Sequence, residues 1–480
     1  MKRFAPGERV DRKDVPELDL DDWRAAVLVS GARLAALFGT REDSGVRLWA
    51  ILAHDRDGRL EAATTSVEDA YPSLTVDLPQ AHLFERELAE EFGLRPEGHP
   101  WLKPVRLAGA SAARYFSVSG REVHEVAVGP VHAGVIEPGH FRFQCHGERV
   151  LHLEIQLGYQ HRGIERTLAG GPGKRTVHHM ETLAGDTSIG HATAYAMIVE
   201  GLSRTRVSAR AKAIRAIALE LERLANHTGD LGALAADAGY LPTAAFCGRL
   251  RGDFLNLSGL LCGSRFGRGL VRPGGIGFDV DPAMAIEMTK RLRAATSDVR
   301  RAADLLWNTP TVLARFEQTG TVTREVAEEL GLVGPAARAS GIERDVRHDF
   351  PSGFYRFSQI PIARMDTGDV FARAMVRALE IERASTFIED VLANLPSGEA
   401  ATDAGGLAPD SVAVSMVEGW RGEVCHVAIT DAAGRFARYK VVDPSFRNWM
   451  GLAMALRDGQ ISDFPLCNKS FNLSYCGFDQ

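Results

Sequence analysis

Two charged residues in glycine-containing motifs are the best candidates for chemistry in this chain. Glu165 ends the run H-R-G-I-E, and Arg421 lies within W-R-G-E. A partly buried carboxyl group can have its pKa raised toward neutrality and then exchange protons, and a guanidinium group supplies a fixed positive charge. A structural role remains open for both: Glu165 pairs with Arg162 or Arg166, and Arg421 binds a backbone group or Glu418.

Histidines and cysteines do not combine into an evident metal site. His178, His179, Asp186 and His191 are separated by seven and five residues, and these spacings on a helix scatter the side chains over different faces. Six cysteines, at positions 145, 247, 262, 425, 467 and 476, form no C-x-x-C pair. The sequence therefore predicts no zinc site, no disulfide framework and no set of ligands for an iron–sulfur cluster.

The segment Glu181–His191 resembles the nickel-binding segment of [NiFe] hydrogenase large subunits. That family has the pattern E-R-V-C-G-I-C-x-x-x-H, and the two sequences align without a gap. Glu181, Gly185 and His191 are in register, but the two cysteine positions carry Ala184 and Thr187. The resemblance thus implies the hydrogenase scaffold without the first pair of metal ligands.

The C-terminal segment 463–477 resembles the segment in which hydrogenases carry D-P-C-x-x-C. Its two cysteine positions fall on Ser474 and Gly477, and Cys476 is one residue out of register. Nickel and iron in such a site need four soft thiolate ligands, which alanine, threonine, serine and glycine do not supply. We therefore expect no metal and no cofactor bound by this chain.

Further landmarks extend the resemblance over most of the sequence. Residues 129–143 look like the first strand segment of group 4, membrane-bound hydrogenase large subunits, and residues 157–165 match G-x-x-H-R-G-x-E. Residues 268–275, 334–341 and 417–423 follow in the family order. The same order occurs in the quinone-site (49-kilodalton) subunit of respiratory complex I, which also lacks the cysteines.

The first hundred residues resemble a different subunit. Residues 84–101 fit the signature E-R-E-x-x-x-x-F-G-x-x-x-x-G-H-P of the 30-kilodalton subunit of complex I. Phe84, Leu88 and Phe92 form an apolar stripe at helical spacing, and Gly93 is placed to end that helix. Fusion of this unit ahead of a large subunit is the layout of formate-hydrogenlyase-type proteins.

The resemblance also implies roles for individual side chains. In hydrogenase relatives the residue matching Glu165 lies beside the metal and passes protons, and the residue matching Arg421 hangs over the open coordination position. His132 and His140 flank the loop that reaches the quinone headgroup in complex I relatives. His191 is expected to support the site or to pack between helices.

The composition is that of a large globular protein. The chain has 480 residues, of which 45% are hydrophobic and 25% charged, with a net charge of −6. Charges of both signs are interspersed without a basic run, so the sequence does not indicate nucleic-acid binding. No apolar run reaches the length of about 18 residues that a membrane span needs. We expect a cytoplasmic protein that is peripheral on the cytoplasmic face of the inner membrane through partner subunits.

The pattern of residues predicts an α+β fold in two domains. Residues 1–110 form a domain like the 30-kilodalton subunit of complex I, 105–120 a linker, and 120–480 a mainly helical hydrogenase-large-subunit-like domain. Alternation over 123–157 predicts a small antiparallel sheet, and strand-like runs return over 412–442. Helices are expected as one long element over 178–239, then at 282–307, 322–331 and 367–394.

Three functions remain open from the sequence. The first is a subunit of a membrane-bound oxidoreductase that passes electrons from a small iron–sulfur partner, like the 20-kilodalton subunit of complex I, to a quinone or another acceptor. It would be assembled with membrane subunits of the complex I or antiporter type. The second is a non-catalytic scaffold or coupling subunit of such a complex. The third is a maturation or regulatory protein. In none of these is the chain an active [NiFe] hydrogenase.

Overall fold

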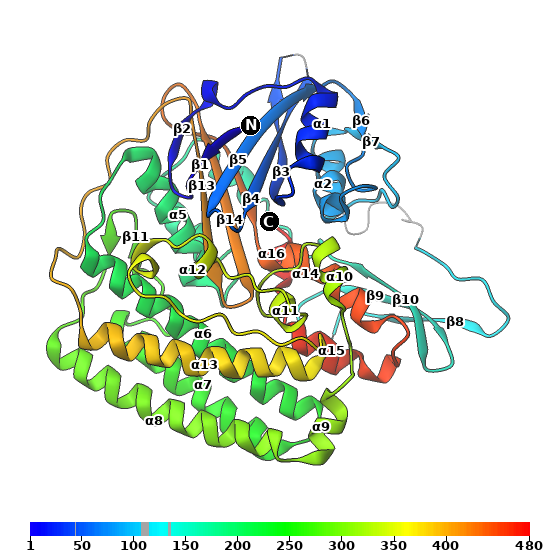
Figure 1. Ribbon diagram of the computed structural model, residues 1–480, viewed down its shortest axis with the longest axis vertical. Coiled ribbons are helices and arrows are strands. Elements are labelled where there is room, and N and C mark those ends of the chain that lie inside the picture. The colour runs from blue at the N-terminus through cyan, green and yellow to red at the C-terminus, as the bar shows by residue number, and fades with distance from the viewer. Residues whose placement is uncertain (44, 107–114, 133–135) are drawn as a thin grey trace.

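The N-terminal unit is an antiparallel sheet with helices beside it. The structure is a computed structural model that describes residues 1–43, 45–106, 115–132 and 136–480. The sheet of the N-terminal unit has the strand order β1-β5-β4-β3. Figure 1 shows this unit in blue above the rest of the molecule. Its elements are β1 Lys2–Phe4, β2 Arg9–Asp11, α1 Leu20–Val29, β3 Arg33–Glu42, β4 Gly45–His54, β5 Arg59–Val67, β6 Ala70–Pro72, α2 His82–Phe92 and β7 Arg95–Glu97.

Helix α2 confirms the predicted signature helix. Phe84 and Leu88 are buried, and Gly93 ends the helix in the left-handed region with φ of 78°. The buried carboxylate of Glu85 accepts hydrogen bonds from the Leu74 amide at 2.8 Å and from the Thr75 amide at 3.1 Å. The helix therefore orders the turn that precedes it as well as its own apolar face.

The second unit starts with the predicted antiparallel sheet. Its strands are β8 Val123–Val128, β9 His140–His146 and β10 Arg149–Gln156, in the order β10-β9-β8. This sheet projects from the side of the molecule in Figure 1. Half of the predicted linker, residues 107–114, lies outside the described residues.

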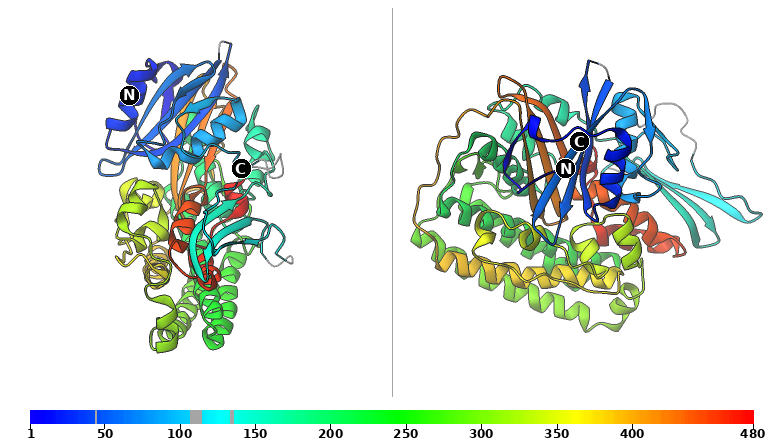
Figure 2. Two further views of the ribbon diagram at one scale, coloured as in Figure 1. Left: turned by 90° about the vertical axis from the view of Figure 1, so that its right-hand side faces the viewer. Right: turned by 45° about the horizontal axis from the view of Figure 1, so that its top comes forward.

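Helices form the body of the second unit. α6 packs against α7 and α13, and α8 packs against α7 and α13. They lie as a layer below the sheets in Figures 1 and 2. The helices are α3 Ile164–Leu168, α4 Thr176–Met180, α5 Ser188–Ser203, α6 Ala209–Asp237, α7 Leu241–Cys262, α8 Pro282–Trp307, α9 Pro310–Phe316, α10 Arg324–Glu329, α11 Gly334–Ala339, α12 Val346–Asp349, α13 Val370–Ala393, α14 Pro444–Leu456, α15 Phe464–Phe471 and α16 Tyr475–Phe478.

The prediction of one long helix over 178–239 is wrong, because this region is divided among α4, α5 and α6. Arg204 ends α5 in the left-handed region with φ of 54°. Ser208 then starts α6 by accepting a hydrogen bond from the Ala211 amide at 3.0 Å. Both breaks contain few apolar residues, and Ser208 is a typical N-cap residue, so the sequence did carry a signal for them.

A sheet with strands from both units joins them. Strands β13 Ser411–Gly419, β14 Gly422–Thr430 and β15 Phe436–Val442 form it together with β2 from the N-terminus, in the order β15-β14-β13-β2. Val10 lies opposite Val412 in this antiparallel pairing. A single hydrophobic cluster contains Trp23 of the first unit and Leu224 of the second. Residues 1–110 and 120–480 thus share a sheet and a core.

Buried charges also cross the boundary between the units. The Arg33 guanidinium donates to the Glu423 carboxylate at 2.6 and 2.8 Å and to Asp55 at 2.8 Å. Arg447, on α14, donates to the Leu34 carbonyl at 2.7 Å.

Within the described part of the chain, none of the helices combines the length and apolar character needed to cross a membrane.

The Arg33–Glu423 pair provides a test of this shared interface. Glu423→Gln should lower the free energy of unfolding by about 2 kcal/mol, because it leaves a buried guanidinium with Asp55 as its carboxylate partner. Denaturant unfolding measures the change. Glu389→Gln is the control, since Arg293 in that pair is 67% exposed and the expected loss is below about 0.5 kcal/mol. Equal losses in the two variants would contradict the interface.

Candidate functional site

The segment that resembles a metal-binding loop forms a tight turn before α5. The Thr187 amide donates to the Ala184 carbonyl at 2.9 Å, and the His191 amide donates to the Thr187 carbonyl at 3.2 Å. Ala184, Thr187 and His191 are all buried. The turn therefore places residues 184–187 at the N-terminal end of a helix whose first turn carries His191.

Arg421 lies in the turn between β13 and β14 and points at this loop. Its guanidinium donates to both oxygens of Asp186, at 2.6 and 2.8 Å, and to the Asn472 carbonyl. It also stacks 3.9 Å from the centre of the Trp420 ring. Burial opposes the charge of Arg421, but the Asp186 carboxylate outweighs this effect and raises the pKa of Arg421. The group is a fixed cation with a carboxylate already bound.

The C-terminal segment packs beside the same turn. Ser474 starts α16 by accepting a hydrogen bond from the Gly477 amide at 2.9 Å, and its own amide donates to the Ser445 hydroxyl at 2.9 Å. Gly477 lies directly against the Asp443 carboxylate. The positions that resemble the second pair of metal ligands are therefore used for helix capping and for close packing.

His191 is the middle member of a buried chain of hydrogen bonds. Its Nε2 lies 3.0 Å from Asp443 Oδ2, and its Nδ1 lies 3.0 Å from His426 Nε2. His426 Nδ1 lies 2.9 Å from the Tyr439 hydroxyl. Because the Asp443 carboxylate is an acceptor, His191 Nε2 donates to it.

Burial and neighbouring charges fix the protonation of this chain. Burial, with a further contribution from His191, lowers the pKa of His426 well below its usual value. Burial opposes the charge of Asp443, but hydrogen bonding to His191 and the nearby Arg421 guanidinium outweigh it and hold the pKa of Asp443 below its usual range. The chain therefore consists of a neutral His426 and an anionic Asp443.

Most of the predicted site residues meet around Asp186 and Asp443, whereas Glu165 lies elsewhere. Its Oε1 accepts from the Val441 amide at 2.9 Å and is 3.1 Å from Lys440 Nζ. Lys440 is also 2.6 Å from Glu87 of the N-terminal unit. Glu165 therefore contacts the seam between the units and is not paired with Arg421. The residues that do meet are Thr187, His191, Arg421, Ser474 and Gly477, with Ala184 in the same turn.

The arrangement does not fit a thiolate-held metal cluster. The four matching positions carry no thiol group, and the Asp443 carboxylate occupies the space next to position 477. Among the described residues, no group of three or more His, Cys, Asp and Glu side chains is placed to share a metal ion. Carboxylate, guanidinium and imidazole groups instead satisfy one another.

An open cavity of about 650 Å³ lies beside this closed cluster. His132 Nδ1 is 3.2 Å from the Glu137 carbonyl oxygen, which identifies Nδ1 as the protonated nitrogen. Burial raises the pKa of Tyr475 to about 12, so its hydroxyl stays protonated. His140 is not among the residues that line this cavity and contacts the Gly129 carbonyl at 3.2 Å. The lining includes His132, Ile136, Glu137, Phe141, Asn472 and Tyr475.

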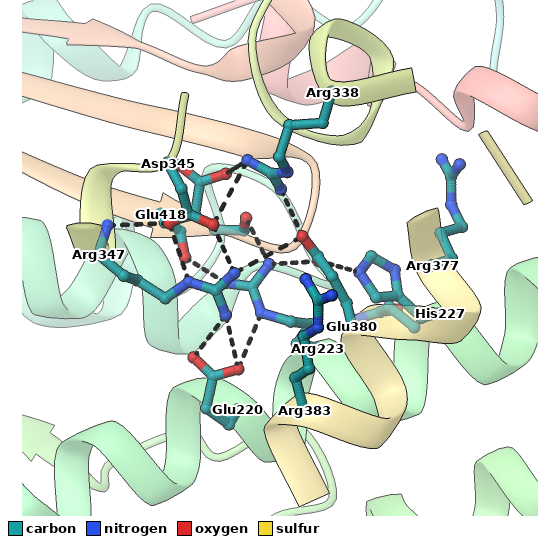
Figure 3. A network of polar contacts seen from close by, with 12 residues as sticks. Glu220, Arg223, His227, Arg338, Asp345, Arg347, Arg377, Glu380, Arg383 and Glu418 are labelled. Carbon is teal, nitrogen blue, oxygen red and sulfur yellow. Dashed lines mark hydrogen bonds and ion pairs between the residues drawn. The ribbon is translucent and has the colours of Figure 1, made fainter. Parts of the chain in front are cut away.

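A network of buried ion pairs holds the turn that carries Arg421 (Figure 3). Arg223 donates to the carbonyls of Glu418 and Gly419, at 2.7 and 3.2 Å. Glu380 on α13 accepts from Arg338 at 2.6 Å and from Arg223 at 3.2 Å. Although burial opposes its charge, these arginines hold the pKa of Glu380 well below its usual range. The network fixes the β13–β14 turn against the helices.

Sequence reasoning missed several of these residues. Glu220, Arg223 and His227 have helical spacing on α6, and three ionisable residues on one face of an apolar helix were a usable signal of a buried network. Asp186 and Asp443 gave no such signal. Each is an isolated carboxylate whose partner lies 235 or 252 residues away in the chain.

Comparison with known proteins agrees with this architecture. Residues 32–110 match the family described as respiratory-chain NADH dehydrogenase, 30 Kd subunit, and residues 237–411 match the 49 Kd subunit family. Formate hydrogenlyase subunit 5 of Escherichia coli (strain K12) is 28% identical over 94% of this chain and 85% of its own length. NADH-quinone oxidoreductase subunit 4 of Thermus thermophilus is 29% identical over 71% and 90%. Membrane-bound hydrogenase subunit alpha of Pyrococcus furiosus is 28% identical over 72% and 85%.

The order of these matches is that of a unit similar to the 30 Kd subunit followed by a unit similar to the 49 Kd subunit. Most of the chain is thus similar to subunits of formate hydrogenlyase, of membrane-bound hydrogenase and of NADH-quinone oxidoreductase. Its relatives are subunits of complex I-like and hydrogenase-like complexes.

The buried histidine chain predicts a particular pH dependence. The folded protein resists protonation of His426, whose unperturbed pKa is 6.5, so its contribution to stability is complete above that pH and is lost as the pH falls below it. His426→Gln removes this effect. The difference in unfolding free energy between the native protein and this variant should therefore shrink from about pH 8 to about pH 5. The exposed His146→Gln variant is the control, and a difference that is constant with pH would contradict the buried neutral chain.

Proposed function

We propose that the chain is an electron-transferring subunit of a membrane-bound, complex I-like oxidoreductase that delivers electrons to a quinone or a similar organic acceptor. The observation that supports this function is the cavity lined by His132 and Tyr475, next to the closed former metal loop. Its volume of about 650 Å³ is within the range of small-ligand sites. Phe141 and Ile136 supply apolar walls for a ring or an isoprenoid chain.

A polar group in this cavity suits the carbonyl oxygen of a quinone. The Tyr475 hydroxyl is buried and has the Asn468 side chain as a hydrogen-bonding neighbour, and under this proposal it donates to a quinone carbonyl oxygen. His132 Nδ1 donates to the Glu137 carbonyl oxygen at 3.2 Å, and its Nε2 is buried beside Gly129. The ring of His132 therefore contributes to the wall of the cavity.

Electrons must reach the cavity from another subunit under this proposal. Five of the six cysteines are buried and unpaired, and Cys476 is partly exposed. They form no pattern that holds an iron–sulfur cluster. We therefore propose a small iron–sulfur partner like the 20-kilodalton subunit of complex I, together with membrane subunits of the complex I or antiporter type that place the chain at the cytoplasmic face of the membrane.

Replacement of Tyr475 tests the cavity. Tyr475→Phe should lower quinone reduction by the purified complex about 10-fold, because one hydrogen bond to the acceptor is lost. The assay is reduction of a short-chain quinone by the complex from its native host, with a reduced viologen as electron donor. Tyr159→Phe, at an exposed position, is the matched control. Unchanged rates in Tyr475→Phe, or purification without any iron–sulfur subunit, would contradict the proposal.

A scaffold role is the second candidate, and one observation favours it. Arg421 is already neutralised by Asp186 at 2.6 Å, so the side chain has no free charge to offer a substrate at that position. If the chain is a scaffold, variants of Tyr475 and His132 will assemble and leave the activity of the whole complex intact. The quinone assay above therefore separates the two functions.

Metal content provides an independent prediction. The complex purified from its native host should contain no stoichiometric nickel in this subunit and should neither consume nor evolve hydrogen, because positions 184, 187, 474 and 477 supply no thiolate. Elemental analysis and a hydrogen electrode measure these properties. One nickel per chain would overturn this expectation.

A further inference from the structure

Polar contacts attach the last residues of the chain to the loop before α5. The Arg421 guanidinium bridges them, since it donates to the Asp186 carboxylate and to the Asn472 carbonyl. Asp479 accepts from the amides of Gly158 and Gln160, both at 2.8 Å. The C-terminal residues Asp479 and Gln480 are themselves buried. The C-terminal segment, residues 472–480, is therefore an internal part of the fold.

We infer that Asp186 and Asp443 take the place of a metal cluster as the link between the loop 184–191 and the C-terminal segment, and that Asp443 keeps the space beside position 477 filled. Asp186 acts through Arg421, and Asp443 acts through His191 and through its contact with Gly477. This inference concerns the loop 184–191 and its contacts with the C-terminal segment, although Asn472 and Tyr475 of that segment also line the proposed quinone cavity.

Asp443 fills the space that a side chain at position 477 needs. A Cβ atom added at Gly477 would lie 2.7 Å from the Asp443 carboxyl carbon and 2.8 and 2.9 Å from its two oxygens. These separations are well inside van der Waals contact for a carbon atom. Asp443 cannot easily move aside, because it accepts from the Ser445 amide at 2.8 Å and is 3.0 Å from His191 Nε2. Aspartate at 443 therefore requires glycine at 477.

The closed cluster is stable without a ligand because its buried polar groups have partners. His191, His426 and Tyr439 form an ordered chain that ends on Asp443. The guanidinium of Arg421 supplies positive charge to Asp186 directly and to Asp443 from nearby. Buried charges that are paired and hydrogen-bonded avoid the large cost of an isolated charge. Cysteine at positions 184, 187, 474 and 477 would leave Asp443 in place, and the space beside position 477 would stay filled.

A double-mutant cycle tests the contact between Asp443 and Gly477. Gly477→Ala should lower the melting temperature of the full chain, whereas Gly185→Ala in the facing loop should not, because nothing lies within 4 Å of a Cβ atom there. In an Asp443→Ala background the effect of Gly477→Ala should disappear, and in an Asp443→Asn background, which keeps the volume, it should persist. Equal effects of Gly477→Ala in all three backgrounds would overturn the inference.

A second arm tests the cross-link through metal binding. The variant with cysteine at positions 184, 187, 474 and 477 should bind no stoichiometric cobalt(II) with thiolate absorption bands. Addition of Asp443→Ala to it should produce one bound cobalt(II) per chain. Tight thiolate binding by the four-cysteine variant with Asp443 intact would overturn the inference. If the cysteine variants fold too poorly to be measured, the double-mutant cycle at Asp443 and Gly477 tests the inference.

Limited proteolysis adds a readout for Asp186. Asp186→Asn should release the C-terminal segment and increase its cleavage several-fold, because Arg421 loses its bidentate partner. Asp431→Asn is the control, since Asp431 accepts hydrogen bonds from the amides of Ala433 and Arg435 in its own surface turn. Unchanged cleavage in Asp186→Asn would contradict the assigned role of this carboxylate.

Discussion

Arginines buried among carboxylates determine how the parts of this protein are held together. Arg338 and Arg223 share Glu380, and Arg223 extends to the backbone of the β13–β14 turn. Removing a charged group from water is costly unless a partner of opposite charge and correct geometry compensates it. Such a network tolerates few alternative arrangements. It therefore fixes the turn from which Arg421 reaches the loop before α5.

Buried charges also connect the two units of the chain, together with a shared sheet. β2 extends the sheet of the second unit, and Arg33 reaches Glu423 across the boundary. Lys440 lies between Glu87 and Glu165. Glu165, predicted as a proton-transferring group beside the former metal site, thus joins the C-terminal sheet to the N-terminal unit. Its catalytic role stays a prediction.

Local patterns in the sequence predicted many elements of the fold. The helix over 282–307 was predicted with the bounds that the structure has, and the sheet over 123–157 and the signature helix ending at Gly93 are confirmed. The predicted long helix failed at residues 181–187 and 204–208, where polar residues and glycine interrupt the apolar pattern. The site could be predicted in outline, because the resemblance aligned positions 184 to 191, 421 and 474 to 477. The carboxylates that close it could not, because no local pattern encodes contacts across 235 residues.

Under the proposed function, the cavity beside residues 184–191 holds the acceptor, and photoaffinity labelling of the assembled complex tests this account most directly. An azido-quinone should label peptides within residues 136–143 and 461–475, which contribute lining residues of the cavity, and an excess of unmodified quinone should abolish the labelling. Competed labelling confined to other parts of the chain, or to partner subunits alone, would contradict the account.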